Sequence, residues 1–175
     1  MPLDPFEQIV SEHYEGLYRF AFGLTRAEAD ACDLTQQTFY IWACKGHQLR
    51  DFGKVKTWLF TTLHREFLKT RRRAVRFPQV ELSEADEEVP VARDMLHTLD
   101  AARLIEFVGQ VQEPYQAALT LFYMEDYSYQ EIADILDVPI GTVRSRISRG
   151  IAQLQQLFLN GKSQSRIRAK AELAV

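Results

Sequence analysis

Apolar residues recur at helical spacing from Phe6 to about Arg73, and strand-like alternation is rare along this stretch. The pattern breaks in residues 77–94, FPQVELSEADEEVPVARD, which contain two prolines, many carboxylates and little periodicity. Such a composition is typical of an extended or disordered linker. The first part of the chain is therefore predicted to be a helical bundle that ends before this linker.

Helical spacing returns at about Asp100, in DAARLIEFVGQVQ, PYQAALTLFYMED and SYQEIADILDV. A last helix is predicted from about Gly141 to Phe158, and Asn160 with Gly161 should stop it. These patterns predict an all-α chain of two small helical domains joined by an acidic flexible linker. The predicted boundaries are 1–76 for the first domain, 77–98 for the linker, 99–160 for the second domain and 161–175 for a basic C-terminal tail.

The stretch SYQEIADILDVPIGTVRSRISRG, residues 128–150, predicts two helices separated by a tight turn. Ser128 and Glu131 have the spacing of a capping box, in which the side chain of each residue accepts a hydrogen bond from the backbone N–H of the other at a helix start. Pro139 disfavours helix at Val138, and Thr142 or the glycine before it then begins the next helix. This arrangement is a helix-turn-helix.

The second of these helices has two distinct faces at 100° per residue. The predicted core face carries Val143, Ile147, Ile151, Leu154 and Phe158, and the opposite face carries Thr142, Ser145, Ser148 and Arg149. Arg144 and Arg146 flank the polar face. Such a helix fits the major groove of DNA, where the outward side chains can reach base edges and the flanking arginines can hold phosphates. The alternative is a solvated basic face on an ordinary helical hairpin.

The charge distribution supports contact with a polyanion, although the net charge is −3. Residues 50–77 hold 9 basic and 2 acidic side chains, and residues 138–175 hold 7 basic and 1 acidic. The residues between them, 78–137, are strongly acidic. Two basic segments separated by an acidic one suggest two nucleic-acid contacts. We also hypothesise that the acidic block folds against the basic segments in the free protein.

The first basic segment contains KTWLFTTLHREFLKTRRR, residues 56–73, which has an apolar stripe of Leu59, Phe60, Leu63 and Phe67. The other side carries Trp58, Thr61, Arg65, Lys69 and Arg72. An exposed tryptophan among cations suits single-stranded nucleic acid, because bases stack on the ring while the cations follow the backbone. A buried Trp58 that packs on the bundle is an equally good interpretation of that residue.

A polar stripe at positions i, i+3, i+4 and i+7 consists of Asp33, Gln36, Gln37 and Tyr40. Physical reasoning alone assigns it to a solvated face. However, the run DLTQQTFYIWA that contains it resembles the D-L-x-Q-x-x-F motif of bacterial sigma factors, in the extracytoplasmic-function (ECF) group of the sigma-70 family. The resemblance implies that Asp33 and Gln36 contact core RNA polymerase, at the clamp coiled coil of its β′ subunit, with Gln37 and Tyr40 beside them.

The other two segments resemble the same family in the same order. TWLFTTLHREFLKTRRR is similar to the helix that melts and reads the minus-ten promoter element, and residues 128–150 are similar to the closing helix-turn-helix, a winged-helix-like domain called region 4, which reads the minus-thirty-five element. The resemblance implies promoter DNA, core polymerase (β′ clamp and β flap) and an anti-sigma factor as partners. It further implies phosphate contacts by Lys54, Lys56, Arg71, Arg72 and Arg73. Family members often carry Asn and Asp where Arg65 and Lys69 align.

Other function classes find little support in the sequence. Apolar runs are too short for a membrane span, so we expect a cytoplasmic protein without membrane insertion. Cys32 and Cys44 suggest two buried structural thiols rather than a metal site or disulfide. The four histidines are scattered, and Glu125 with Asp126 suggests a solvated turn, so neither a catalytic centre nor a cofactor is predicted. A free-standing helix-turn-helix regulator, which binds its operator without polymerase, stays open as an alternative.

Overall fold

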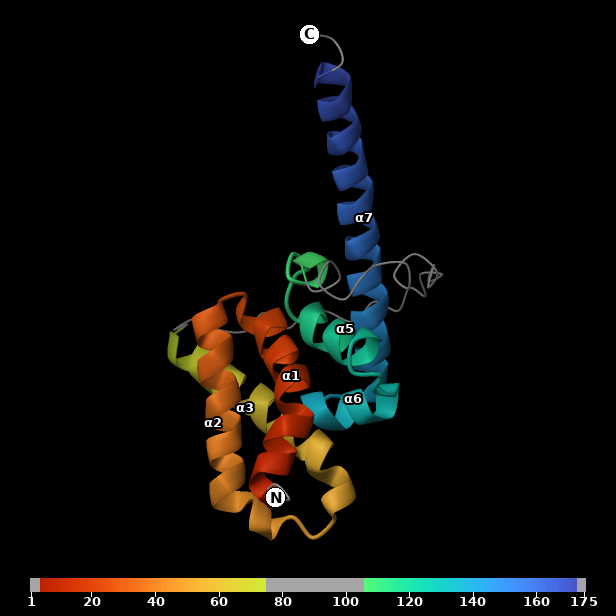
Figure 1. Ribbon diagram of the computed structural model, residues 1–175. Helices are drawn as coiled ribbons and strands as arrows, with labels where there is room; N and C mark the ends of the chain where they lie inside the picture. Colours follow the sequence, from red (N-terminus) through yellow and green to blue (C-terminus); the bar gives the residue numbers. More distant parts are fainter. Residues whose placement is uncertain (1–3, 75–105, 173–175) are drawn as a thin grey trace.

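The computed structural model describes residues 4–74 and 106–172, and every regular element in these ranges is helical (Figure 1). The all-α prediction is confirmed. The helices are α1 (Pro5–Thr25), α2 (Glu28–Lys45), α3 (Val55–Ala74), α5 (Tyr115–Tyr123), α6 (Tyr129–Leu136) and α7 (Ile140–Glu172), with short 3₁₀ turns η1 (Gly46–Gln48) and η2 (Phe52–Lys54). The predicted linker, residues 77–98, lies outside the described residues.

Helices α1, α2 and α3 pack side by side as the first bundle (Figure 1). Helix α1 begins with Pro5, where the backbone N–H of Asp4 donates to the Glu7 carboxylate, and it ends at Arg26, whose backbone is left-handed with φ 57°. The predicted core stripe of α3 is confirmed, since Leu59, Phe60, Leu63 and Phe67 are all buried. Cys32 is half-buried and Cys44 exposed, so the expectation of two buried thiols is wrong for Cys44.

Helices α5, α6 and α7 form the predicted helix-turn-helix unit. The capping box is present: the Ser128 backbone N–H and hydroxyl both donate to the Glu131 carboxylate, at 2.8 and 2.7 Å, and these bonds lower the pKa of that carboxyl. Helix α6 ends where Asp137 turns left-handed at φ 57°. Helix α7 begins at Ile140, slightly earlier than predicted, because the fixed φ of Pro139 leads directly into a helix.

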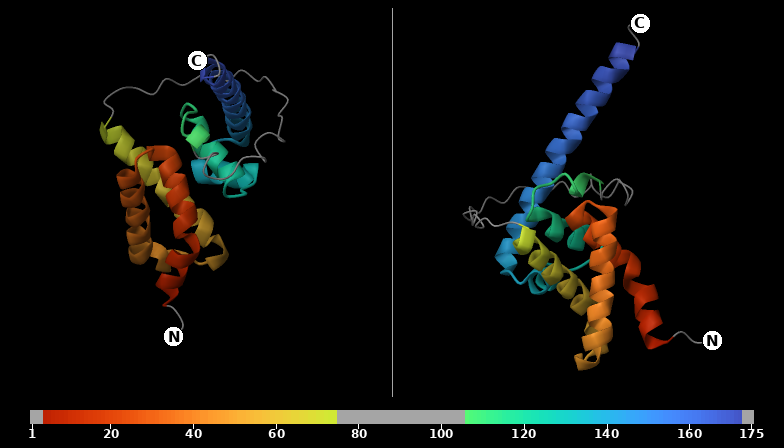
Figure 2. Two further views of the ribbon diagram at one scale, coloured as in Figure 1. Left: turned by 45° about the horizontal axis from the view of Figure 1, so that its top comes forward. Right: turned by 90° about the vertical axis from the view of Figure 1, so that its left-hand side faces the viewer.

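Helix α7 is longer than predicted and projects away from the remainder of the molecule (Figures 1 and 2). It continues through Asn160 and Gly161 to Glu172, so the prediction of a stop at these residues is wrong. A single glycine inside a helix costs only about 1 kcal/mol relative to alanine, and the Lys, Gln, Arg and Ala residues that follow favour helix. Residues 161–172 therefore continue helix α7.

The two helical units pack against each other, with α1 against α5 and α3 against α6 (Figure 2). Their buried apolar residues form one continuous cluster, from Leu17 in α1 to Leu154 in α7. At the junction the Tyr127 ring meets the Phe60 ring edge to face, with centroids 5.5 Å apart. The segments predicted as two linked domains are thus in direct contact.

Gly150 allows α7 to approach α5 closely, and we expect Gly150→Ala to lower the free energy of unfolding by about 1–3 kcal/mol. An added Cβ would lie 2.7 Å from Leu119 Cδ1 and 3.1 Å from Tyr115 Cβ, and Leu119 is fully buried. The helix-propensity gain of about 1 kcal/mol would offset only part of this strain. Gly141→Ala, with nothing within 4 Å of the new Cβ, is the matched control in urea unfolding and should be neutral or stabilising. Equal effects of the two changes would contradict the close-packing argument.

Candidate functional site

The polar stripe of α2 lies on the surface. Asp33, Gln36, Gln37 and Tyr40 are all exposed, and Tyr40 has 64% of its surface accessible to solvent. The opposite side of α2 is buried and includes Leu34, Phe39 and Trp42. This division follows from helical periodicity and leaves the polar stripe on the surface.

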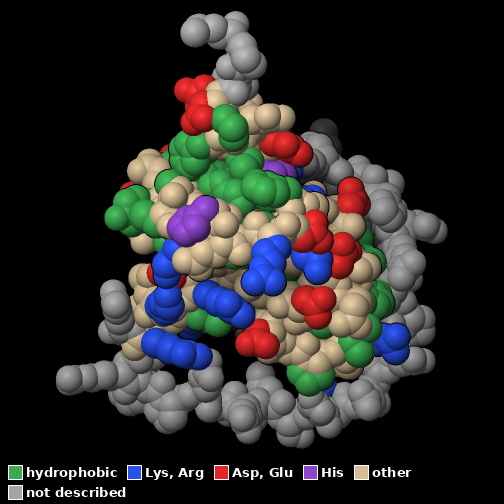
Figure 3. Space-filling view, turned by 90° about the horizontal axis from the view of Figure 1, so that it is seen from below, with side chains coloured by type: hydrophobic (Ala, Val, Ile, Leu, Met, Phe, Trp, Pro, Cys, Tyr) green, Lys and Arg blue, Asp and Glu red, His purple; other side chains and the backbone are tan. Residues whose placement is uncertain are grey.

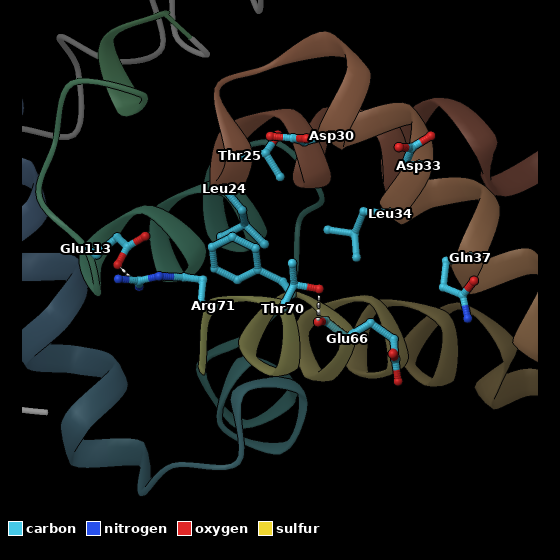
Figure 4. Close-up of a pocket in the computed structure, with 11 residues that line it drawn as sticks. Leu24, Thr25, Asp30, Asp33, Leu34, Gln37, Glu66, Thr70, Arg71 and Glu113 are labelled. Carbon is cyan, nitrogen blue, oxygen red and sulfur yellow. Dashed lines mark hydrogen bonds and ion pairs between the residues drawn. The ribbon is translucent and has the colours of Figure 1, made fainter. Parts of the chain in front are cut away.

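A groove of about 560 Å³ lies next to this stripe and is lined by the end of α1, by α2 and by α3 (Figure 4). Asp33 and Gln37 line it from α2, and Phe67 and Arg71 line it from α3. Figure 4 shows Arg71 reaching across to Glu113, which precedes α5, and the two side chains form an ion pair. The second helical unit therefore contributes one residue, Glu113, to the lining of the groove.

The predicted minus-ten residues lie on α3 or directly before it, and they differ in their contacts. Lys54, Arg65, Lys69, Arg71 and Arg72 are exposed, although Lys69 is paired with Glu66. Trp58 is half-buried, and its ring packs edge to face on the Trp42 ring at 5.1 Å, which favours the packing interpretation of this residue. The side chain of Arg73 lies outside the described part of the chain. A band of Lys and Arg side chains with carboxylates among them appears on one face of the molecule (Figure 3).

The predicted minus-thirty-five residues all occur in the first three turns of α7. Arg144 is exposed, and the other five, Thr142, Ser145, Arg146, Ser148 and Arg149, are half-buried. The Ser145 hydroxyl donates to the Thr142 carbonyl at 3.0 Å, and the Ser148 hydroxyl is buried without a hydrogen-bond partner among the described residues. Burial lowers the pKa of the Arg146 guanidinium. The expected fully outward face is therefore only partly open in this arrangement of the two units.

Glu125, expected in a solvated turn, is buried with 7% of its surface exposed, so that expectation is wrong. Arg19 Nη2 donates to its Oε1 at 3.1 Å, and Lys56 Nζ lies 3.7 Å from its Oε2. Lys56 also donates to the Glu125 backbone carbonyl at 3.1 Å. No sequence signal could identify these contacts, because the partners lie 106 and 69 positions away. Asp126 alone remains exposed there.

His64 of α3 is buried beside Phe20, with ring centroids 6.5 Å apart. Burial lowers its pKa to about 4, and the nearby cations Arg146 and Arg65 add to the effect. The folded protein thus resists protonation of this ring. Arg146 belongs to the opposite unit, so His64 lies near the junction of the two.

The low pKa of His64 predicts loss of stability in acid. An unfolded histidine takes up a proton near pH 6.5 and the folded one only near pH 4, so the stabilisation is complete above pH 6.5 and is lost as the pH falls toward 4. The loss should be about 3 kcal/mol at most. Urea unfolding of wild type and His64→Gln across this range measures it, because the variant lacks the titrating ring. Identical pH slopes for the two proteins would show that His64 contributes nothing.

Metal and membrane sites are not indicated in the part of the chain that the structure describes. Within it, His, Cys, Asp and Glu side chains do not gather in threes that could hold a metal ion. None of the described helices is both long enough and apolar enough to cross a membrane.

Comparison with protein families finds two matches in order along the chain. The model described as "Sigma-70 region 2" matches residues 9–77, and the model described as "Sigma-70, region 4" matches residues 101–154. The first covers α1 to α3 with the polar stripe and the basic helix, and the second covers the helix-turn-helix.

Curated relatives match along most of this chain. The chain is 32% identical over 165 residues to the ECF RNA polymerase sigma factor SigE of Mycolicibacterium smegmatis, covering 91% of this chain and 64% of that protein. It is 30% identical to the RNA polymerase sigma factor HrpL of Pseudomonas syringae, over 85% of this chain and 84% of that one. It is 25% identical to the RNA polymerase sigma factor YlaC of Bacillus subtilis, over 94% and 98%.

Two solved structures have the same fold. The sigma factor RpoE from Bartonella quintana, in complex with the anti-sigma factor NepR, matches with TM-score 0.68 at 25% identity, over 89% of this chain and 98% of that one. CnrH, in complex with the cytosolic domain of CnrY, matches with TM-score 0.59 at 23% identity, over 87% and 86%. The two family regions and the similarity to HrpL along most of both chains show that the chain belongs to the sigma-70 family, and the relatives named ECF RNA polymerase sigma factors, SigE among them, place it in the ECF group.

Proposed function

We propose that this protein is a promoter-specificity subunit, which binds core RNA polymerase, directs it to promoters and helps to melt the DNA, without catalysis of its own. The observation that carries the proposal is the presence of both sigma-70 regions in one chain, in the family's order. The relatives that span most of this chain are themselves sigma factors. Since polymerase and chromosome share the bacterial cytoplasm, the protein should act there.

The polymerase-binding surface in this proposal is the exposed stripe of α2, namely Asp33, Gln36, Gln37 and Tyr40. All four side chains are accessible, while the same helix is anchored to the core by Leu34, Phe39 and Trp42. A rigid helix with a fixed polar face can dock without reorganising, which favours affinity.

The promoter-binding surfaces are the basic side of α3 and the start of α7. For melting, a base that leaves the duplex must be held by stacking and polar contacts that offset the few kcal/mol of unstacking. Phe52, which is 68% exposed in the turn before α3, supports this role because its ring is available for stacking. Lys54, Arg65, Lys69, Arg71 and Arg72 offer exposed cations along the same helix or next to it.

An anti-sigma factor is a further proposed partner. The solved relatives RpoE and CnrH were each captured with another protein, the anti-sigma factor NepR and the cytosolic domain of CnrY. The shared fold supports a comparable partner for this chain.

A free-standing helix-turn-helix regulator is less well supported, because it has no need of a first helical unit with an exposed polymerase-type motif. Run-off transcription with core polymerase on a promoter library tests the proposal directly, and wild type should direct initiation at a defined set of promoters. Absence of initiation, together with tight operator binding in gel shifts without polymerase, would favour the regulator instead.

Two arginines of α7 should respond differently when binding to the same promoter library is measured at several salt concentrations. Arg149→Ala is expected to relax discrimination at one minus-thirty-five position by about 1–3 kcal/mol, if its base contact is bidentate. Arg144→Ala, the matched control on the flank of the helix, should weaken binding at all sequences and lower the log–log salt slope by about 1. The same change in base preference for both variants would contradict the division of roles along this helix.

A further inference from the structure

The turn between α5 and α6 holds a buried carboxylate against the first helical unit. We propose that Glu125 acts as an internal substitute for a DNA phosphate, holding the two units closed and lowering the affinity of the free protein for DNA. This inference rests on the proposed DNA-binding function, and it adds a residue-level mechanism for keeping the unbound protein inactive.

The site is built for a carboxylate. The Glu125 side chain retains 5% exposure and contacts Arg19 of α1 and Lys56 of α3, at 3.1 and 3.7 Å. A buried charge is tolerated when opposite charges surround it, and removing one partner is strongly unfavourable. Gly16 of α1 provides the space, because an added Cβ there would lie 2.7 Å from Glu125 Oε2.

Neighbouring contacts fix this turn in place. Lys56 Nζ lies 4.7 Å from the centre of the Tyr127 ring, which itself packs on Phe60. Lys56 also bonds the Glu125 carbonyl. The lysine therefore meets three groups of the second unit, all within residues 125–127.

Two cations in the contacts between the units are ones for which the family resemblance implies a phosphate contact. Lys56 was predicted to hold a promoter phosphate and is paired here with Glu125. Arg71, predicted for the same role, is paired with Glu113 of the second unit. Carboxylates are thus paired with two side chains that are proposed to bind phosphates. DNA must displace these carboxylates before it can bind there.

Competition of this kind lowers the apparent affinity for DNA, because only the open molecules bind. The apparent affinity equals the affinity of the open form multiplied by the fraction of molecules that are open. A partner that binds only the open form, such as core polymerase, would raise the affinity for DNA. The same closed arrangement accounts for the half-burial of Arg146 near His64 at the junction.

The test measures binding of the full chain to a fluorescein-labelled, mixed-sequence DNA single strand at low salt, by fluorescence anisotropy. Glu125→Gln should raise the affinity about 5-fold or more, the low end of the usual coupling between two sites. Asp126→Asn, the neighbouring exposed carboxylate, makes the same charge change in a left-handed conformation that Asn tolerates, and it should change the affinity less than about 2-fold. Circular dichroism confirms that each variant is folded.

For Arg19→Gln, the proposal and simple electrostatics predict changes of DNA affinity in opposite directions. Losing a positive charge should weaken DNA binding, whereas opening the closed form should strengthen it. Stronger binding by Arg19→Gln, with a larger radius of gyration in X-ray scattering without DNA, would support the proposal. Weaker or unchanged binding, or equal effects of Glu125→Gln and Asp126→Asn, would overturn it.

The outcome is separable from that of the proposed function. Wild type that directs run-off transcription while Glu125→Gln and Asp126→Asn bind DNA alike would leave the sigma assignment intact and remove the closed-form mechanism. Wild type that fails to direct initiation, with the variant pattern as expected, would support the closure and remove the sigma assignment.

Discussion

Asp33→Ala should abolish initiation at every promoter in run-off transcription with core polymerase. Asp33 is exposed at the centre of the proposed docking stripe on α2 and lies on the rim of the groove between α2 and α3. If Asp33 is a hot spot of this interface, its truncation costs at least about 2 kcal/mol, a roughly 30-fold loss of affinity. The effect should be the same at all promoters, because without polymerase docking the choice of DNA no longer matters.

The matched control is Glu28→Ala, which removes the same charge five residues earlier on α2 and outside the groove. It should keep initiation and cost at most about 1 kcal/mol of helix stability, since an acidic residue in the first turn favours the helix dipole. Fluorescence anisotropy of the labelled variants with core polymerase measures docking separately from transcription. Loss of initiation at some promoters only would assign Asp33 to DNA rather than to polymerase.

Phe20→Ala should lower the free energy of unfolding by about 3–5 kcal/mol, a large part of the 5–15 kcal/mol typical of a folded domain. Phe20 has 0% exposure, and its ring lies 5.4 Å from that of Phe60. Because Phe60 also contacts Tyr127 of the second unit, the cavity would weaken both the first bundle and its junction with the helix-turn-helix.

Urea unfolding monitored by circular dichroism measures the loss. Phe52→Ala makes the same chemical change at a position that is 68% exposed, and it should shift the free energy of unfolding by less than about 0.5 kcal/mol. Similar losses for both variants would mean that the Phe20 environment is not the packed core that its burial indicates.

Much of the local structure was predictable because it depends on neighbours in the sequence. The capping box of Ser128 and Glu131 and the core stripe of α3 involve residues at most eight positions apart on a single helix. The polar stripe of α2 is exposed for the same reason, since the apolar residues of that helix take the opposite side. The end of α7 was mispredicted, because one glycine is a weak stop signal when helix-forming residues follow it.

The chain's order of two helical units, its buried stripes and its exposed α2 motif were determined by the sequence alone, through helical periodicity and capping. Tertiary structure decided which charges meet. The sequence predicts the same solvent exposure for Glu125 and its neighbour Asp126. In the fold only Glu125 is buried, against Arg19 and Lys56. Contacts across such sequence distances depend on how whole helices pack, and no local pattern encodes that packing.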